Sequence, residues 1–501
     1  MGVAEAVAEY WEKRRGFIFA AIGSAIGLGN IWRFSYLCYK DGGGAFLVPY
    51  FIALLIVGVP LIILEFVLGN YFRGSPIKVF ASIRRPLEIF GWFAVLDQFI
   101  IGTYYSVVLA WVMCYIGFSA KAAWWSPSAT PVAIARSVSS VWNAFLSSPG
   151  LILAGFAITW FITWITLFRG VSGGIEKACT FAIPALWVLS AILVVRGVTL
   201  PHHTVGINWY LTPNWSKMAN GTVWIDAFGQ ILFTLSLMAA PLVIYAAYMP
   251  PKSELPNSAW ITAFANCGFS FFFGFATWGI IGFLMGILGI TNPELIVHQL
   301  HFKLGGVGLA FLTIPAAVSF LPGAPISTAV FGTIFFVILW LAGYTSLLSI
   351  VEPVYGAIRD KFRISRKVGV SIVCGLMFLF GLIFVFMPGL IGPVDFITGS
   401  TNLIWLVMLE AIIAGWMYSM EKLIAYANPY AELKLGRWWE IFVKFISPIA
   451  LAVILGYGLV SVKVISPASV IVLVLMTILV LIFSGIKWRG EEPKPPEEVT
   501  A

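Results

Sequence analysis

Residues 23–34, Gly-Ser-Ala-Ile-Gly-Leu-Gly-Asn-Ile-Trp-Arg-Phe, place three glycines, an asparagine and an arginine in what should be a membrane helix. They lie in the first long apolar segment, where each glycine costs a helix about 1 kcal/mol relative to alanine. Arg33 costs at least about 2.5 kcal/mol more if it is placed in hydrocarbon. Irregular backbone at membrane depth is tolerated where it is buried in protein or lines a wet cavity. We therefore predict a broken helix whose freed carbonyls and amides face a binding site.

A second break is predicted between Gly229 and Pro241, in Gly-Gln-Ile-Leu-Phe-Thr-Leu-Ser-Leu-Met-Ala-Ala-Pro. Pro241 removes a backbone donor and clashes with the preceding turn. The polar residues Gln230, Thr234 and Ser236 cluster just before it. Broken helices in corresponding places, here the first and the sixth, are typical of a secondary transporter built from two five-helix repeats around a midplane site.

The composition predicts an all-α polytopic membrane protein. Of the 501 residues, 60% are hydrophobic and 10% are charged, against about 25% charged in soluble domains. A membrane-spanning helix needs roughly 20 apolar residues, and about twelve segments meet this length: 16–38, 44–70, 88–118, 150–168, 177–199, 225–248, 258–289, 327–357, 368–388, 395–423, 438–461 and 466–486. The stretch 303–322 is apolar but holds glycines and two prolines, and we expect a helical loop there at the outer mouth.

The basic residues predict the topology. The net charge is +8, and the loops on the side of the N-terminus hold most of the Lys and Arg, as the positive-inside rule requires of cytoplasmic loops. We therefore expect a multi-pass protein of the plasma membrane, in contact with lipid, with both termini in the cytoplasm. The charge is a topology signal rather than a nucleic-acid-binding surface, and the sequence carries no signal for an oligomeric state. The expected parts are a cytoplasmic segment 1–15, helices 1–5 in 16–199, an extracellular loop 200–224, helices 6–10 in 225–424, helices 11 and 12 in 438–486, and a cytoplasmic tail 487–501.

Cysteines and histidines give no catalytic pattern. The five cysteines are odd in number and scattered through apolar segments, as expected of small buried side chains. The four histidines fall in expected outer loops, where His298 and His301 have an i, i+3 spacing that only weakly suggests zinc. Hydrolase and metalloprotease motifs are missing, so we do not expect an enzyme.

Seven motifs resemble the neurotransmitter:sodium symporter family, whose structural type is the bacterial leucine transporter. They are GSAIGLGNIWRF (23–34), DGGGAFLVPY (41–50), GVPLIILEFVLG (58–69), TYYS (103–106), GQILFTLSL (229–237), AGYTSLLSI (342–350) and PVDFITG (393–399). The resemblance extends from about residue 11 to residue 424. It implies a 5+5 inverted repeat and sodium-coupled amino-acid symport by alternating access.

The resemblance also implies two sodium sites, and Na⁺, as a hard cation, takes oxygen ligands. The first site would use the Ala25 carbonyl together with Asn30, Thr234, Asn266 and the substrate carboxylate. The second would use the carbonyls of Gly23, Ile26 and Ala342 and the hydroxyls of Thr345 and Ser346. The alternative for these two hydroxyls is hydrogen bonding back to their own helix.

For the substrate, the resemblance implies a carboxylate bound by amides near Leu28 and Gly29 and by the Tyr105 hydroxyl. Gly27 stands where monoamine transporters of the family carry Asp, which favours an amino acid over an amine. The remaining substrate contacts implied are Ala25, Ile101, Phe233, Thr234, Ser236, Ala239, Ser346 and Ile350. This pocket predicts an apolar or aromatic substrate side chain. Met238-Ala239-Ala240 replaces the usual Gly-x-Gly, so that Ala239 would enlarge the pocket and Met238 would refill it or stiffen the break.

A chloride site is the further implication. Many bacterial members have a carboxylate four residues after the Asn of helix seven, whereas animal members have Ser there and bind chloride, and this chain has Ser270 after Asn266. The family's chloride site resembles a group of four residues in this chain, Tyr50, Gln230, Thr234 and Ser270. A negative charge at this place would stabilise the neighbouring sodium ion by Coulomb attraction. Asp97 is the alternative source of that charge, or of a coupled proton, unless it is a cytoplasmic-end residue paired with a loop arginine. Glu65 and Glu410 match acids of the family and are expected to be structural.

Two sets of residues resemble the family's gates. Arg33 and Asp395 would pair above the site, because an isolated charge at that depth is costly. Trp11, Tyr248 and Asp360 match inner-gate positions, with Arg14 or a neighbour replacing the usual basic partner, which falls at Ala8. The alternatives to sodium symport are a proton-coupled or exchange-type amino-acid transporter and a membrane amino-acid sensor.

Overall fold

The computed structural model describes residues 9–127, 130–302, 304–461, 466–489 and 492–494. Residues 1–8 of the expected N-terminal segment, residue 303 of the outer loop, and residues 490–491 and 495–501 of the expected tail lie outside the described residues. The described residues are helical and have no strand beyond a single bridge between Gly43 and Pro213.

The first half of the bundle contains α1 (Arg14–Ala25), α2 (Phe34–Lys40), α3 (Gly44–Ala53), α4 (Val59–Phe72), α5 (Pro76–Ile83), α6 (Glu88–Ala120), α7 (Pro131–Leu146), α8 (Pro149–Phe168), α9 (Lys177–Val198), α10 (His203–Leu211) and α11 (Gly221–Thr234). The second half contains α12 (Pro241–Ala247), α13 (Pro256–Leu288), α14 (Glu294–Leu300), α15 (Ile314–Val318), α16 (Ile326–Phe362), α17 (Arg366–Phe386), α18 (Ile391–Asp395), α19 (Leu403–Ile412), α20 (Met420–Ala427), α21 (Arg437–Ile441), α22 (Ser447–Ser461) and α23 (Pro467–Gly485).

Short π-helical or 3₁₀ turns join many of these helices: η1 (Gly29–Arg33), η2 (Leu54–Gly58), η3 (Arg85–Leu87), η4 (Val171–Glu176), η5 (Trp215–Ala219), η6 (Leu309–Thr313), η7 (Pro388–Leu390), η8 (Phe396–Asn402), η9 (Ile413–Met417), η10 (Asn428–Tyr430) and η11 (Phe442–Ile446). Two π-helical turns, η1 and η8, lie beside the predicted binding region, and such turns often occur at functional sites.

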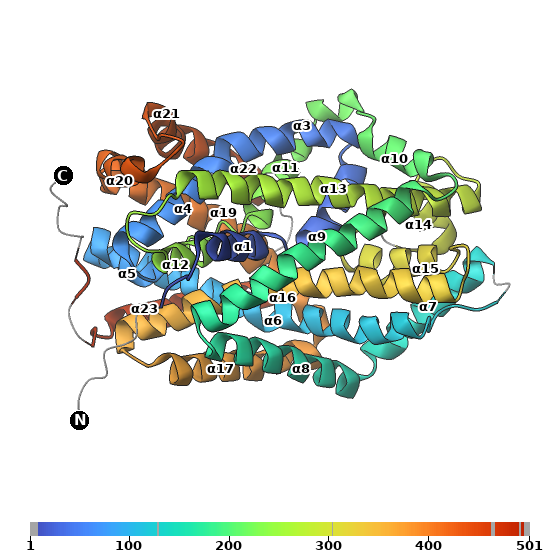
Figure 1. Ribbon diagram of the computed structural model, residues 1–501, viewed down its shortest axis with the longest axis horizontal. Helices are drawn as coiled ribbons and strands as arrows, with labels where there is room; N and C mark the ends of the chain where they lie inside the picture. The colour runs from blue at the N-terminus through green and yellow to red at the C-terminus, as the bar shows by residue number, and fades with distance from the viewer. Residues whose placement is uncertain (1–8, 128–129, 303, 462–465, 490–491, 495–501) are drawn as a thin grey trace.

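The long helices run along the long axis of the molecule (Figure 1). α6 packs along α16, and α1 packs against α9, α13 and α16. The first broken helix is therefore enclosed by other helices, where freed backbone groups avoid lipid.

The described residues contain ten helices that are long and apolar enough to cross a membrane, and the pair Arg14–Ala25 and Gly29–Lys40, bent by 56°, makes an eleventh. α11 and α12, the two halves of the second broken helix, are each too short to count. The prediction of about twelve spans therefore stays a prediction, while the polytopic helical fold is confirmed.

Two sequence-based boundaries differ from those in the structure. The span expected at 395–423 runs from Pro388 to Met417, because Tyr418 is extended and Ser419 caps the separate helix α20. The stretch expected as an extracellular loop, 200–224, holds α10 and η5, and α11 already begins at Gly221. A hydropathy pattern identifies long apolar segments and does not detect short helices such as α10 and η5 within a loop.

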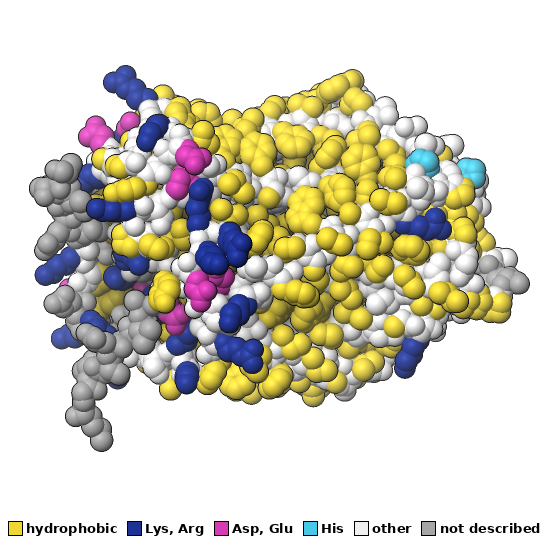
Figure 2. Space-filling view, in the orientation of Figure 1, with side chains coloured by type: hydrophobic (Ala, Val, Ile, Leu, Met, Phe, Trp, Pro, Cys, Tyr) yellow, Lys and Arg dark blue, Asp and Glu magenta, His cyan; other side chains and the backbone are white. Residues whose placement is uncertain are grey.

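Charged side chains gather at one end of the molecule, which we call the basic end. On the face shown in Figure 2, Lys and Arg are concentrated at this end, hydrophobic side chains cover the middle, and histidines lie at the opposite end. Hydrogen bonds join the start of the chain to the end of α12 and the end of α16 to the start of α5 at the basic end. The apolar middle is what a protein surrounded by lipid requires.

Candidate functional site

Both predicted helix breaks are present. α1 ends at Ala25 because Ile26 is extended, with φ −74° and ψ 101°. α11 ends at Thr234, and Pro241 begins α12 as its first residue, a position where proline's missing donor costs nothing. Between them Ser236 and Ala239 adopt positive φ angles of 53° and 54°, which is uncommon for residues with a Cβ.

A buried carboxylate holds the second break together. Glu65 Oε1 accepts hydrogen bonds from the backbone N–H groups of Met238 and Ala239 at 3.0 and 2.9 Å. Ser236 Oγ donates to the Ser24 carbonyl at 2.7 Å and ties the second break to the first. The two interrupted helices thus form one connected site, and Glu65 has a structural role in it.

The predicted second sodium site is a group of crowded oxygens. Ser346 Oγ lies 3.2–3.3 Å from four carbonyl oxygens, those of Gly23, Ser24, Ile26 and Ala342. A hydroxyl has one proton to donate, so it cannot satisfy all four, and the remaining contacts set oxygen against oxygen. Neutral oxygens converging in this way form a donor set that fits a hard monovalent cation.

Thr345 lies beside this group but bonds back to its own helix. Its Oγ1 donates to the carbonyls of Leu341 and Ala342 at 3.2 and 3.1 Å, which is the alternative that the sequence left open. A Cβ built on Gly23 would lie 3.3 Å from this Oγ1. The Thr345 side chain therefore packs against Gly23 near the end of α1, and all five predicted ligands are brought together.

The predicted first sodium site has the same oxygen crowding. Asn266 Oδ1 lies 3.1 Å from the carbonyl oxygens of both Ala25 and Thr234. Rotating the amide by half a turn would place its Nδ2 2.8 Å from Asn30 Nδ2, donor against donor. Asn30 is itself fixed, because its Oδ1 accepts from the Gly27 amide at 2.8 Å. Neither orientation of the Asn266 amide satisfies every group, whereas a cation between Asn266 Oδ1 and the carbonyl oxygens of Ala25 and Thr234 would do so. These oxygens therefore fit sodium. Asn30, in contrast, presents its nitrogen rather than its oxygen to Asn266.

A cavity of about 60 Å³ lies between the two breaks. It is lined by Ser24, Ala25, Gly27, Leu28, Asn30, Gln98, Ile101, Tyr104, Tyr105, Phe233, Ser236, Met238, Pro241, Ser346, Ile350, Asp395 and Gly399. Most of the predicted substrate contacts are in this lining. Gly29, Thr234 and Ala239 are not. A Cβ on Gly29 would meet the Phe233 ring at 2.5 Å, so this glycine is needed for close packing against Phe233.

The polar end of the cavity holds Tyr105. Its buried hydroxyl has no hydrogen-bond partner among the described residues. A Cβ built on Gly27 would lie 3.3 Å from this hydroxyl and 3.0 Å from Ser346 Oγ. The helix that begins at Gly29 also leaves its first amides without intrahelical acceptors. Donors therefore converge where a carboxylate is predicted.

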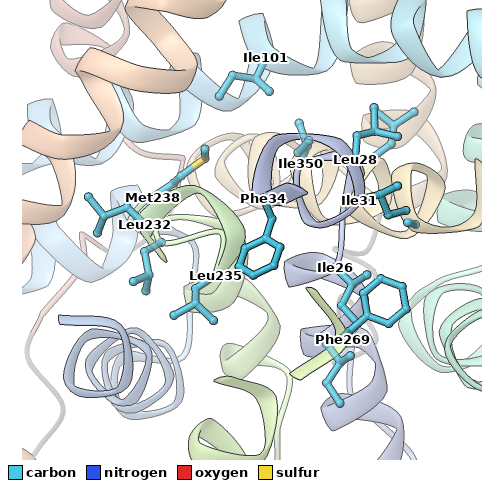
Figure 3. Close-up of a cluster of buried hydrophobic side chains, with 14 of the residues drawn as sticks. Ile26, Leu28, Ile31, Phe34, Ile101, Leu232, Leu235, Met238, Phe269 and Ile350 are labelled. Atoms are coloured by element: carbon cyan, nitrogen blue, oxygen red, sulfur yellow. The ribbon is translucent and has the colours of Figure 1, made fainter. Parts of the chain in front are cut away.

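The expectation that Ala239 enlarges the pocket is wrong. Ala239 packs instead in a separate buried cluster with Phe80, Phe90 and Leu406, because its positive φ turns the side chain away from the cavity. Met238 takes its place in the lining. Figure 3 shows Met238 extending its sulfur from the break toward the region between Ile101 and Ile350.

Two of the residues predicted to bind chloride, Ser270 and Gln230, are hydrogen-bonded to residues 29–33 of the first broken helix. Ser270 Oγ accepts from Asn30 Nδ2 at 2.8 Å, and Tyr50 has a buried hydroxyl without a partner among the described residues. Gln230 donates to the Gly29 carbonyl and accepts from Arg33. Asn30 thus links the sodium group to Ser270.

The predicted outer pair is not formed. Arg33 Nη1 donates to Gln230 Oε1 at 3.0 Å, and its guanidinium lies over the Phe233 ring, 5.1 Å from the centroid. Asp395 Oδ1 accepts from the Tyr104 hydroxyl at 2.8 Å. Among the described residues Arg33 and Asp395 share no ion pair, because each charge has a closer polar partner.

The residues predicted for the inner gate, Trp11, Tyr248 and Asp360, are connected to one another through other partners than expected. Trp11 donates through Nε1 to the Tyr245 carbonyl at 2.7 Å and through its backbone N–H to the Tyr248 carbonyl at 3.2 Å. Arg14 pairs with Glu254 at 2.5 Å, so it does not replace the missing basic partner of Asp360. That partner is Arg359, 2.8 Å away.

Sequence reasoning missed Glu352, which lies beside these residues. Arg366 donates to both its carboxylate oxygens at 2.8 and 2.9 Å, and the Tyr248 hydroxyl donates to Oε1 at 2.7 Å. A signal was available, because Glu352 is an isolated acid in the apolar stretch 342–358.

Of the alternatives left open for Asp97, pairing with a loop arginine is wrong. Its side chain is fully buried, and Oδ1 accepts from Asn402 Nδ2 at 2.8 Å. Oδ2 has no partner among the described residues. A buried carboxylate with a free oxygen is costly, which makes Asp97 an unexplained acid one helical turn from Ile101.

Two broken helices with crowded oxygens around a central cavity define a polytopic membrane transporter that binds cations and a small molecule. The chain belongs to the Sodium:neurotransmitter symporter family, whose sequence profile matches residues 8–144 and 132–482. It is therefore a sodium-coupled transporter.

Individual relatives agree with this assignment. The chain is 40% identical over 458 residues to an uncharacterised sodium-dependent transporter of Methanocaldococcus jannaschii, covering 89% of both chains. It is 31% identical to the human sodium- and chloride-dependent creatine transporter 1, covering 87% of this chain and 75% of the relative. Among solved structures, MhsT in complex with L-phenylalanine matches with a TM-score of 0.76 and 28% identity, covering 89% of this chain and 98% of MhsT.

Proposed function

We propose that this protein couples sodium entry to the uptake of an amino acid with an apolar or aromatic side chain. The observation that carries the proposal is the Tyr105 hydroxyl, which is buried beside Gly27 and has no partner in the described chain. A substrate carboxylate supplies the acceptor. Apolar Ile101, Phe233 and Ile350 line the rest of the cavity and suit an apolar side chain.

Two sodium ions would travel with the substrate. The oxygens around Ser346 and those around Asn266 are neutral, which suits a monovalent ion that must also leave. The substrate carboxylate would complete the set at Ala25, Asn30, Thr234 and Asn266, so that substrate and ion bind together. The basic end would face the cytoplasm and both termini would lie there, with the protein in the plasma membrane.

Uptake of labelled L-phenylalanine into proteoliposomes tests this function. With an inward sodium gradient we expect accumulation above equilibrium, and with potassium in place of sodium only the background expected of empty liposomes. Equal and non-concentrative uptake under both conditions would contradict sodium coupling. An inward proton gradient without sodium is the informative third condition, because accumulation there would show proton coupling, for which Asp97 is the candidate carboxylate.

Chloride is the second ion whose role we infer. Ser270 lies within 2.8 Å of Asn30 Nδ2, where an internal carboxylate is missing, and the human relative is named as chloride-dependent. Ser270→Glu places a negative charge there and is expected to make sodium-driven uptake nearly independent of chloride. Uptake by the wild type should fall by about tenfold or more when gluconate replaces chloride. The reason is that an attraction between chloride and sodium of about 1.4 kcal/mol or more is lost.

Ser270→Ala is the matched control for this substitution. It removes the hydroxyl without adding charge, so its uptake should still require chloride. Wild-type uptake that is indifferent to chloride, or a Ser270→Glu variant as chloride-dependent as the wild type, would contradict the chloride site.

A further inference from the structure

Gln98 is a polar side chain at the otherwise apolar end of the cavity, and neither sodium nor carboxylate binding gives it a role. It lies one turn before Ile101 on α6, is fully buried and lines the cavity. Its Nε2 donates to the sulfur of Met238. Its Oε1 has no hydrogen-bond partner among the described residues. Leaving a buried acceptor unpaired destabilises a folded protein, so a ligand that supplies a donor would relieve this cost.

Met238 determines which end of the amide is available. Rotating the Gln98 amide by half a turn would place Oε1 against the Met238 sulfur, which is a weak acceptor with no proton to donate. The nearby walls formed by Ile101, Pro241 and Ile350 have no side-chain donor. The amide oxygen therefore remains the free group at this end of the cavity.

The cavity places this oxygen opposite the carboxylate end. Gln98 and Tyr105 are two turns apart on α6, about 10 Å along the helix axis. An amino acid whose carboxylate meets the Tyr105 hydroxyl extends its side chain past Ile101, toward Gln98. A long side chain with a polar tip can reach the amide, whereas a short branched side chain cannot.

We propose that Gln98 selects substrates whose apolar side chain ends in an N–H or O–H donor, so that L-tyrosine and L-tryptophan are preferred to L-phenylalanine and L-leucine. The inference rests on the proposed amino-acid transport and adds a requirement that the apolar walls do not impose. A site built to hydrogen-bond a substrate donor rejects the analogue without it, because the buried group of the site is then left unpaired.

L-Tyrosine and L-phenylalanine provide the test, because they differ by one hydroxyl. We measure sodium-driven uptake of each in proteoliposomes and compare their kcat/KM values. The wild type should prefer L-tyrosine by about tenfold or more. Gln98→Leu, which keeps the volume and removes the amide, should lower or reverse the ratio. Gln98→Asn, which withdraws the amide from the cavity, should also lower it and provides a second variant if Gln98→Leu does not fold.

Thr103→Val is the matched control, since it removes a buried hydroxyl of the same helix that donates to the Ile100 carbonyl and does not line the cavity, and it should retain a preference for L-tyrosine. A wild type that prefers L-phenylalanine, or a ratio that Gln98→Leu and Gln98→Asn leave unchanged, would overturn the inference while leaving sodium-coupled amino-acid transport intact. Absence of sodium-driven uptake of either amino acid by the wild type would overturn this inference and the proposed function together.

Discussion

Replacing Ser346 with alanine is expected to raise the sodium concentration that gives half-maximal uptake by about 10- to 100-fold. The Ser346 hydroxyl lies among four carbonyl oxygens, at 3.2–3.3 Å from each, and is a ligand in the proposed second sodium site. A hydrogen-bonding or coordinating contact to a charged group contributes about 1.5–3 kcal/mol, which converts to this range of affinity. Sodium titration of uptake at saturating substrate measures the effect.

A second measurement separates lost coordination from general damage. Sodium that binds the folded protein raises its thermal stability by mass action, so the sodium-dependent increase in Tm should shrink in Ser346→Ala. Thr328→Val is the matched control, because Thr328 lies on the same helix as Ser346. The substitution removes a buried hydroxyl that donates to the Val318 carbonyl at 3.0 Å. The control should retain the wild-type sodium dependence. If Ser346→Ala also retains it, the oxygen group is not a sodium site.

The helix breaks could be predicted from sequence because their causes are local. Glycines and an arginine at 23–34 disfavour a lipid-facing helix, and Pro241 cannot continue one. These rules act over a few residues and need no knowledge of the fold. The same holds for the residues that gather at the breaks, because the motifs fix their spacing along each helix.

The partners of the charged residues could not be predicted in this way. Arg33 donates to Gln230, 197 positions away along the chain, and Arg14 donates to Glu254, 240 positions away. Asp97 meets Asn402 across 305 positions. Which side chains meet depends on how whole helices rotate and pack, and hydropathy carries no information on that rotation. A charge in an apolar segment therefore predicts that a partner exists but not which partner.

The direction of the side chains in the second break was unpredictable for a related reason. Resemblance to the family's Gly-x-Gly pattern predicts that Ala239 lies in the pocket, but the positive φ angles of Ser236 and Ala239 turn the chain so that Met238 faces it. The sequence gives little warning, because residues with a Cβ seldom adopt this conformation. The role of Gln98 in the cavity could not be predicted from the sequence either, because its contact with Met238 depends on that turn.

Replacing Tyr105 with phenylalanine is expected to raise the KM for the transported amino acid by about 10- to 100-fold. The variant loses one donor to a carboxylate, which contributes about 1.5–3 kcal/mol. The substrate-free protein should be as stable as the wild type or slightly more stable, because the buried hydroxyl has no partner to lose among the described residues. Uptake kinetics at saturating sodium, together with the Tm of the substrate-free protein, measure both effects.

Tyr115→Phe is the matched control that separates an effect on folding from an effect on substrate binding. Tyr115 is on the same helix, is fully buried, and has a hydroxyl that also lacks a partner among the described residues, but it does not line the cavity. Both substitutions remove the same atom from a comparably buried site, so any effect on folding or insertion should appear in both. Only Tyr105→Phe should change KM. Equal KM values in the two variants would show that Tyr105 does not bind the substrate, and the carboxylate would then have to be bound by the amides that open the helix at Gly29.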